Sequence, residues 1–234
     1  MKTEPSGLRS HSLVGGTLAN DVLHRLREDI ISCLLKPGER LRFEPLREIY
    51  GVSFSTLREA LSRLASEKLV IAEGQRGFVV APISVADLLD LTNARVLLER
   101  ECVRLSMLQG GPEWKGLILA AYHRLDRVDA TLGDAHRVTS DWDRVHFDFH
   151  EMLVGAAGSP ILNEMRHALF EKARRYRRLS ALVRKSPGVK RAEHRSLMEA
   201  VLSEDVAAAQ DMVERHIREV AQNVIDNGLE LIAA

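Results

Sequence analysis

The sequence has little of what marks secreted, membrane-bound or disulfide-stabilised proteins. It contains two cysteines in 234 residues, Cys33 and Cys102, and neither has a second cysteine at C-x-x-C spacing. Both lie on apolar faces of helical patterns, so we expect buried free thiols in a reducing compartment. No apolar run approaches the roughly 18 residues of a membrane span. Residues 1–16 lack the apolar stretch of roughly 7–15 residues found in signal peptides, which predicts a cytoplasmic protein with a flexible N-terminal arm.

Aromatic residues and net charge are also scarce. Aromatics make up 5% of the chain, and 33 Lys and Arg balance 33 Asp and Glu. This neutral total excludes a strongly basic nucleic-acid-binding protein, but a local DNA-binding face remains compatible with it. The chain is otherwise 45% hydrophobic and 28% charged, as in ordinary globular proteins. Its abundant Leu, Ala, Arg and Glu favour helices.

Hydrophobic periodicity divides the chain into two parts and predicts a mostly α fold. The first part, residues 17–82, shows three helical patterns and then two β-rich runs around a glycine-containing loop, which indicates a β-hairpin. The expected helices are 17–35, 45–50 and 54–68. The second part, residues 83–234, opens on a capping signal at "SVAD" and is helical throughout. Its expected helices are 84–109, 112–131, 134–156, 159–182, 189–203 and 205–229.

Three helices followed by a β-hairpin are the layout of a winged helix-turn-helix. In such a unit the second helix of the motif enters the DNA major groove with its N-terminal residues facing the bases. The candidate DNA contacts are therefore Arg42, Arg47, Ser53, Phe54, Ser55, Thr56 and Arg58 on the helical part, with Gly74, Arg76 and Gly77 at the wing tip. On periodicity alone, a packing unit without DNA contact is the alternative.

Residues 36–82 closely resemble the DNA-binding domain of the GntR family of bacterial transcription regulators. The family pattern runs P-G-x-x-L, then L-A-x-x-x-G-V-S-R-T-P-V-R-E-A-L-x-x-L, then G-L-V and R-G-x-x-V. The positions that match are Pro37, Gly38, Leu41, Leu46, Gly51, Val52, Ser53, Arg58, Glu59, Ala60, Leu61, Leu64, Leu69, Val70, Arg76, Gly77 and Val79. The resemblance implies an operator-binding regulator.

One position departs from that pattern in a way that concerns DNA. "SFST" replaces "SRTP", so Phe54 stands where the family has an arginine that contacts DNA. Two consequences stay open. Either the readout shifts toward thymine methyl groups or DNA shape, or Arg40, Arg42, Arg47 or Arg76 takes more of the contact.

Four histidines form the second candidate site. His146 and His150 are four residues apart and share one helix face, while His194 and His216 lie on two later helices. Imidazole nitrogens bind Zn²⁺, Ni²⁺ and Fe²⁺, and helical bundles build metal sites from inward side chains. Spacing alone leaves open that these histidines only pack.

Residues 84–229 resemble the FCD domain, the helical effector-binding domain of the FadR branch of the same family. The matching positions are Arg95, Leu98, Glu99, Phe149, His150, Glu193, His194 and His216, together with "AAGSP". In metal-binding members an Asp and three His hold one divalent ion. The resemblance carries over His150, His194 and His216, while His146 stands at the Asp position. A four-histidine set is one charge unit more positive, so zinc is the expected metal, with nickel as the alternative.

Arginines supply the other candidate contacts. Arg95 faces the bundle interior by its period, and its partner is either Glu99 or the carboxylate of an effector. The basic segment 171–185 is expected to be a solvated helix face. His24, His123, His136 and His167 belong to no cluster and are expected at the surface.

The function predicted from these patterns is a ligand-responsive transcription regulator, expected to be a repressor. A homodimer would read a pseudo-palindromic operator, and a small anionic metabolite would bind at the metal. Three alternatives remain: a metal-free effector pocket, a structural dimer without effector, and a metal-dependent enzyme. The enzyme lacks support, because no H-E-x-x-H motif supplies a base, and Asp148 and Glu151 turn away from the histidine face.

Overall fold

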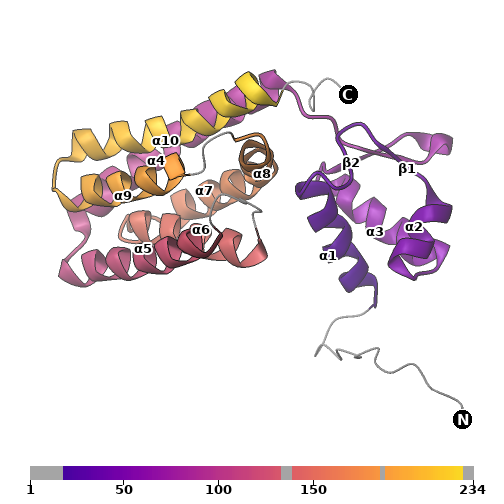
Figure 1. Ribbon diagram of the computed structural model, residues 1–234, viewed down its shortest axis with the longest axis horizontal. Coiled ribbons are helices and arrows are strands. Elements are labelled where there is room, and N and C mark those ends of the chain that lie inside the picture. The colour runs from indigo at the N-terminus through magenta and orange to yellow at the C-terminus, as the bar shows by residue number, and fades with distance from the viewer. Residues whose placement is uncertain (1–17, 133–138, 185–187, 229–234) are drawn as a thin grey trace, which may run out of the picture. The chain divides into compact units, whose positions relative to one another are not determined.

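The computed structural model describes residues 18–132, 139–184 and 188–228, which form two compact units (Figure 1). The first unit takes in the described residues up to Ile30 together with Gly38–Ala81, and the second takes in Ile31–Pro37 and the described residues from Pro82 onward. The expected arm over residues 1–16 and a helix cap at Thr17 lie outside the described residues.

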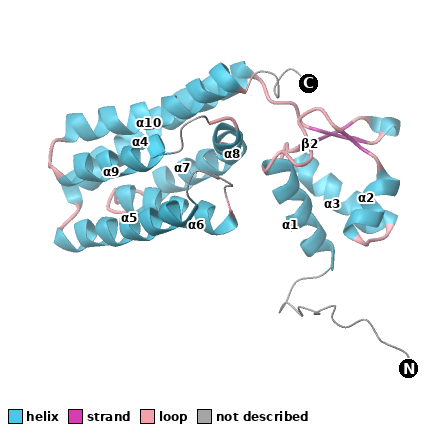
Figure 2. Cartoon of the chain, in the orientation of Figure 1, coloured by secondary structure: helices cyan, strands magenta, loops and turns pink. Residues whose placement is uncertain are grey.

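The first unit is a winged helix-turn-helix, as the sequence predicted. Its helices are α1 (Leu18–Ile31), α2 (Phe43–Tyr50) and α3 (Phe54–Ser66). Three short strands, coloured magenta in Figure 2, are β1 (Arg40–Leu41), β2 (Val70–Ala72) and β3 (Phe78–Val80). They form an antiparallel sheet in the order β1-β3-β2. The two-residue β1 was not predicted, because its length carries no alternation that a sequence pattern could show.

Local signals explain the helix-turn-helix. Gly51 ends α2 in the left-handed conformation, with φ of 67°, which costs glycine little. Ser53 then caps α3, because its hydroxyl accepts a hydrogen bond from the Thr56 backbone amide. The helices pack through fully buried apolar side chains at Leu26, Ile30, Leu57, Leu61 and Leu64.

The second unit is an all-helical bundle. Its helices are α4 (Val85–Gln109), α5 (Pro112–Leu132), α6 (Ser140–Val154), α7 (Pro160–Lys172), α8 (Arg174–Leu182), α9 (Gly188–Leu202) and α10 (Val206–Asn227). Ser84 caps α4 by accepting from the Asp87 amide, as the capping signal predicted. Helix α10 packs along α4, and α5 packs against α6 and α9 (Figure 1). The core between them includes Cys102, Ile118, Leu125 and Phe149.

Two predicted features of the helices are wrong. The single helix expected over 159–182 is divided at Ala173 into α7 and α8. No proline or glycine lies at this break, so the sequence carries no signal for it. Just beyond the break, the Tyr176 hydroxyl donates a hydrogen bond to Asp87 at 2.8 Å. Cys33 lies in a turn after α1 with a φ of 58° and is only partly buried, although both cysteines are free thiols.

Among the described residues, no helix has the length and apolar character that crossing a bilayer requires.

Candidate metal centre and nucleic-acid interface

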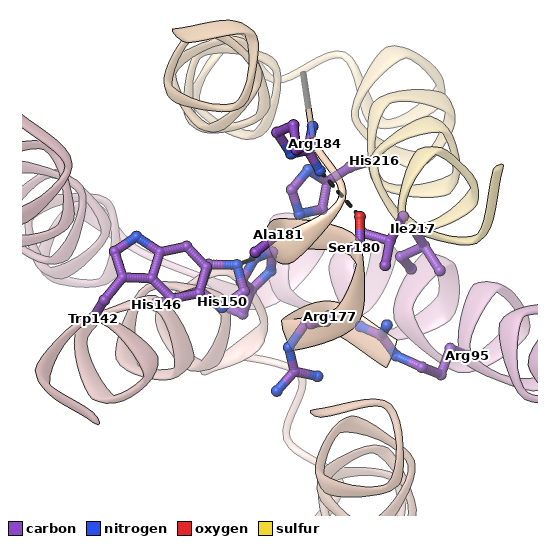
Figure 3. A pocket seen from close by; sticks show the side chains of 11 residues that line it. Arg95, Trp142, His146, His150, Arg177, Ser180, Ala181, Arg184, His216 and Ile217 are labelled. Atoms are coloured by element: carbon purple, nitrogen blue, oxygen red, sulfur yellow. Dashed lines mark hydrogen bonds between the residues drawn. The ribbon is translucent and has the colours of Figure 1, made fainter. Parts of the chain in front are cut away.

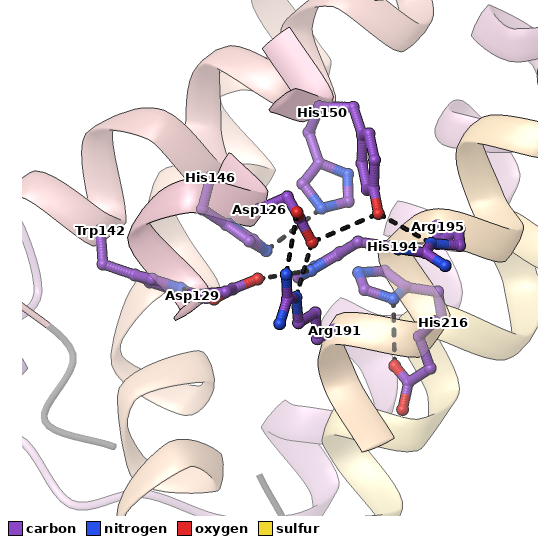
Figure 4. Close-up of polar contacts among 11 residues, drawn as sticks. Asp126, Asp129, Trp142, His146, His150, Arg191, His194, Arg195 and His216 are labelled. Atoms are coloured by element: carbon purple, nitrogen blue, oxygen red, sulfur yellow. Dashed lines mark hydrogen bonds and ion pairs between the residues drawn. The ribbon is translucent and has the colours of Figure 1, made fainter. Parts of the chain in front are cut away.

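The four predicted histidines meet in the bundle core. His146 and His150 come from α6, His194 from α9 and His216 from α10, and all four are buried. His146, His150 and His216 border a cavity (Figure 3). Figure 4 shows all four rings turned toward one another. One nitrogen from each ring lies within 4.8 Å of the other three. The Nε2 atoms of His146 and His150 are 3.2 Å apart.

The sequence of α6 fixes the direction of its two histidines. Val145, Phe149 and Leu153 on this helix are core residues, and His146 and His150 occupy the adjoining buried stripe. The His146 ring stacks on Trp142, with centroids 4.4 Å apart and an interplanar angle of 19°. Aromatic packing therefore holds the ring in place before any ion binds.

Burial and mutual proximity decide the protonation state of the α6 pair. Desolvation, and secondarily the neighbouring imidazoles, lower the pKa of both His146 and His150 well below the usual value. Both rings are therefore neutral at physiological pH. The neutral imidazole is the form that donates a lone pair to a metal.

Carboxylates outside the cluster orient two of the rings. The Nδ1 of His216 lies 3.3 Å from Glu193 Oε2, and the Nδ1 of His194 lies 3.7 Å from Asp129 Oδ2. Trp142 Nε1 donates to the other oxygen of Asp129, at 2.6 Å. A carboxylate at one imidazole nitrogen leaves the second nitrogen for a metal. Sequence reasoning did not find Asp129, since a single acidic residue on α5 gives no signal of its own.

This donor set fits a divalent ion such as zinc. Tetrahedral zinc with Zn–N bonds of about 2.0–2.1 Å places ligand nitrogens about 3.3 Å apart, close to the separation of the His146 and His150 Nε2 atoms. No carboxylate joins the four histidines in the part of the chain that the structure describes. Asp148 instead pairs with Arg144, at 3.8 Å, and Glu151 pairs with Arg166.

The cavity beside the histidines is rich in guanidinium groups. Its lining comprises Arg95, Trp142, His146, His150, Arg177, Ser180, Ala181, Arg184, His216, Ile217 and Val220, with no carboxylate among these described residues (Figure 3). Arg95 is buried, as predicted, and lies 3.8 Å from Glu99. The sequence thus found one of the three arginines and missed Arg177 and Arg184.

Arg177 is partly buried and is held by contacts to Phe170. Its Nη1 donates to the Phe170 carbonyl at 2.6 Å, and its guanidinium lies 3.7 Å from the centroid of the Phe170 ring. Its Nε has no hydrogen-bond partner among the described residues. Burial, and then the nearby charge of Arg95, lower the pKa of Arg177 to about 9. An anion in the cavity would offset both the burial of the Arg177 charge and its repulsion by Arg95.

The expectation of a solvated basic face over 171–185 is wrong. Arg175 and Arg178 are buried, and Arg178 forms an ion pair with the Asp143 carboxylate, which also pairs with Arg174 at 3.1 Å. Burying Arg178 is tolerable because the α6 carboxylate Asp143 supplies its counter-charge. His24, His123 and His167 are exposed, as predicted, whereas His136 lies outside the described residues.

Most of the candidate DNA contacts line two neighbouring hollows, and Ser55 and Thr56 line neither. Arg42, Phe54, Arg58, Gly74, Arg76 and Gly77 line one groove beside the wing, together with Arg40. Arg47 and Ser53 line the other. The Ser53 hydroxyl caps α3 and lies 2.9 Å from the hydroxyls of both Ser55 and Thr56, so its first role is structural.

The wing tip has the backbone that its glycines allow. Gly74 and Gly77 have φ of 57° and 91°, values that side-chain-bearing residues rarely adopt. The Glu73 amide donates to the Gly77 carbonyl at 2.8 Å and closes the turn. The turn presents Arg76 on the same groove as Arg58.

Comparison with known families matches both units. Residues 18–80 match the family described as "Bacterial regulatory proteins, gntR family", and residues 90–219 match the FCD domain.

Two curated relatives match along most of their length. The chain is 36% identical over 214 residues to the uncharacterized HTH-type transcriptional regulator BphR of Paraburkholderia xenovorans, covering 91% of this chain and 87% of the relative. It is 36% identical over 196 residues to the HTH-type transcriptional repressor GlaR of Escherichia coli, covering 82% and 89%.

Solved structures share the fold. A GntR transcriptional regulator from Rhodococcus sp. RHA1, described in its title as putative, superposes with a TM-score of 0.66 at 20% identity, over 89% of this chain and 97% of that one. E. coli McbR/YncC superposes with a TM-score of 0.62 at 23% identity, over 91% and 97%. At these identities the likeness concerns architecture alone.

Proposed function

The chain belongs to the GntR family of bacterial transcription regulators and carries an FCD domain, and from this premise we propose that it is a repressor controlled by a small carboxylate bound at a metal. The chain is a DNA-binding regulator and not an enzyme, as the sequence predicted, because both families and the relatives are transcription regulators. Repression is inferred from the likeness to GlaR, which is described as a repressor.

The observation that supports the metal is the convergence of four buried imidazole nitrogens within 4.8 Å. We propose zinc as the ion, with nickel as the alternative, held by His146, His150, His194 and His216. The bound ion supplies a Lewis-acid position for the oxygens of an anionic ligand. Asp129 and Glu193 keep the His194 and His216 rings oriented toward it.

The arginines of the cavity support a carboxylate as the ligand. Four neutral histidines leave the charge of a divalent ion uncompensated, and Arg95, Arg177 and Arg184 add further positive charge. Charged groups in a partly buried cavity need a counter-charge. A planar guanidinium also matches a carboxylate through two parallel hydrogen bonds. Arg95 and Arg177 are therefore the proposed anchors of the effector.

Regulation requires coupling between ligand and DNA. In the proposed dimer, two winged helix-turn-helix units read the halves of a pseudo-palindromic operator in the cytoplasm. Large apolar side chains exposed on α4, at Leu89, Leu97 and Leu108, are consistent with a covered helix face in that dimer. Binding of the effector in the bundle would change the placement of the DNA-binding units and release the operator.

The experiment that tests the metal is elemental mass spectrometry of protein purified without a histidine tag. We expect near-stoichiometric zinc or nickel in the wild type and its loss in His150→Ala, whereas His123→Ala, a matched substitution at an exposed histidine, keeps the metal. Far-UV circular dichroism establishes that each variant is folded. Absence of metal from the wild type after reconstitution would contradict the proposal and favour a metal-free pocket anchored by Arg95 and Arg177.

A further inference from the structure

Phe54 is an exposed aromatic side chain on the DNA-facing end of a recognition helix. It is the first residue of α3 and is 45% exposed. Its ring stacks on Phe43, the first residue of α2, with centroids 4.4 Å apart and an interplanar angle of 25°. Phe43 in turn lies 6.1 Å from the ring of Phe78 on β3. We call Phe43, Phe54 and Phe78 the aromatic ledge.

The aromatic ledge holds Phe54 in its exposed position. Phe78 is buried and Phe43 is half-buried, so the support beneath Phe54 belongs to the folded unit. A lone exposed phenyl ring would change rotamer freely, whereas a ring stacked on a neighbour keeps one orientation. The packing therefore presents an apolar surface of fixed position at the end of α3.

The aromatic ledge is surrounded by side chains of the kind that contact DNA. The groove that contains Phe43, Phe54 and Phe78 is also lined by Arg40, Arg42, Arg58 and Arg76. Guanidinium groups hold phosphates and position the helix on the duplex. Phe54 lies one helical turn before Arg58, so both side chains reach outward on one side of α3. Glu44 also lines the groove, and Arg40 pairs with Glu73 at 3.3 Å. The apolar surface therefore lies among Arg42, Arg58 and Arg76, and such a surface fits a base edge better than it fits a protein partner.

The chemistry of the major groove then selects the base. Among the groups that base pairs present there, the thymine 5-methyl is the apolar one. A phenylalanine cannot donate the hydrogen bonds by which an arginine reads guanine. We propose that Phe54, supported by Phe43, contacts a thymine methyl group in each operator half-site, so that the operator carries thymine where an arginine at this position would select guanine.

The test removes the methyl group and nothing else. An operator is selected from random DNA with the full-length protein, and each thymine is then replaced in turn by deoxyuridine, which pairs identically but lacks the methyl. We expect one replacement per half-site to weaken binding about fourfold, as the burial of one methyl-sized group implies. Affinity is measured by fluorescence anisotropy at one salt concentration.

Variants assign the effect to the ring. Phe54→Ala should bind the thymine and deoxyuridine operators equally, while Phe54→Arg should prefer guanine at that base pair. Ile71→Ala, which removes an apolar side chain of similar exposure on β2, should keep the discrimination. A wild type insensitive to every deoxyuridine replacement would overturn the proposal. So would a folded Phe54→Ala protein that still discriminates, because the methyl contact would then lie elsewhere.

Discussion

At the scale of single residues, Asp129 is a carboxylate outside the proposed metal ligands that lies beside the histidine cluster. It lies between two rings, accepting from Trp142 and facing the Nδ1 of His194. Trp142 stacks on His146, so one carboxylate holds two of the four ligands in position. Such outer carboxylates raise the basicity of the ligand and fix its tautomer.

Asp129→Asn should lower zinc affinity by roughly 10–100-fold. The amide keeps the size of the side chain and an oxygen for Trp142 but loses the charge that faces His194. Competition against a chelating dye measures the affinity. The control is Asp126→Asn, one turn earlier on α5, whose carboxylate pairs with Arg191 at 2.6 Å instead of with a histidine. Equal zinc affinity in Asp129→Asn and Asp126→Asn would show that Asp129 plays no part at the metal.

The contrast between the histidines and Asp129 shows what residue patterns can and cannot reveal. His146 and His150 could be paired by helical spacing, and His194 and His216 by resemblance to a family motif. Asp129 and Arg177 have no such mark, because their roles arise only when α5 and α8 pack beside α6. Burial of like-charged arginines also contradicts the usual solvation of basic helices, so no local rule predicted it.

At the scale of elements, α8 contributes Arg177 to the cavity beside the histidines, while Arg95 comes from α4 and Arg184 follows the end of α8. Arg174 and Arg178 of this helix share Asp143 on α6, so part of their charge is neutralised within the bundle. Arg177 lacks an acidic partner in the cavity lining and is held by the Phe170 carbonyl and ring. Arg177 lies four residues beyond the break at Ala173 and lines the cavity. The single helix predicted over 159–182 did not indicate this position.

This charge balance predicts that zinc-loaded protein prefers dicarboxylates to monocarboxylates. In a series from three to six carbons, each dicarboxylate should raise the melting temperature more than the monocarboxylate of equal length, since a second carboxylate can reach Arg177 while the first is at the metal. Arg177→Gln should remove the difference between the two series. Arg191→Gln, which changes an arginine paired with Asp126 outside the cavity, should preserve it. An equal response to both series in the wild type would rule out a second anion contact.

At the scale of the whole molecule, the division into two units was easier to predict from the sequence than the packing of helices within a unit. The change from helical to alternating periodicity near residue 69 marked the wing, and glycine and serine marked the turn before α3. The bounds of most helices followed from Gly, Pro and capping residues. The pairing of α4 with α10, far apart in sequence, follows only from packing the apolar stripes of both.

A regulator with one ligand site and one DNA site must couple them reciprocally. If a dicarboxylate weakens operator binding by some factor, operator DNA must weaken dicarboxylate binding by the same factor, with a typical coupling of about 1–3 kcal/mol, or roughly 5–150-fold. Anisotropy titrations of labelled operator with and without the dicarboxylate give one factor. Calorimetric titrations of the dicarboxylate with and without operator give the other, and unequal factors would mean that a further species takes part.

The histidine cluster should be necessary for that coupling and unnecessary for DNA binding itself. The contacts to DNA proposed here all lie in the first unit, whereas His150 lies in the core of the second. Metal-free His150→Ala should therefore bind operator with the affinity of the ligand-free wild type, yet no longer respond to the dicarboxylate. His123→Ala should respond as the wild type does. If His150→Ala instead lost operator affinity while remaining folded, the metal would serve to organise the repressor for DNA, and the ligand would act on an assembly that already depends on the ion.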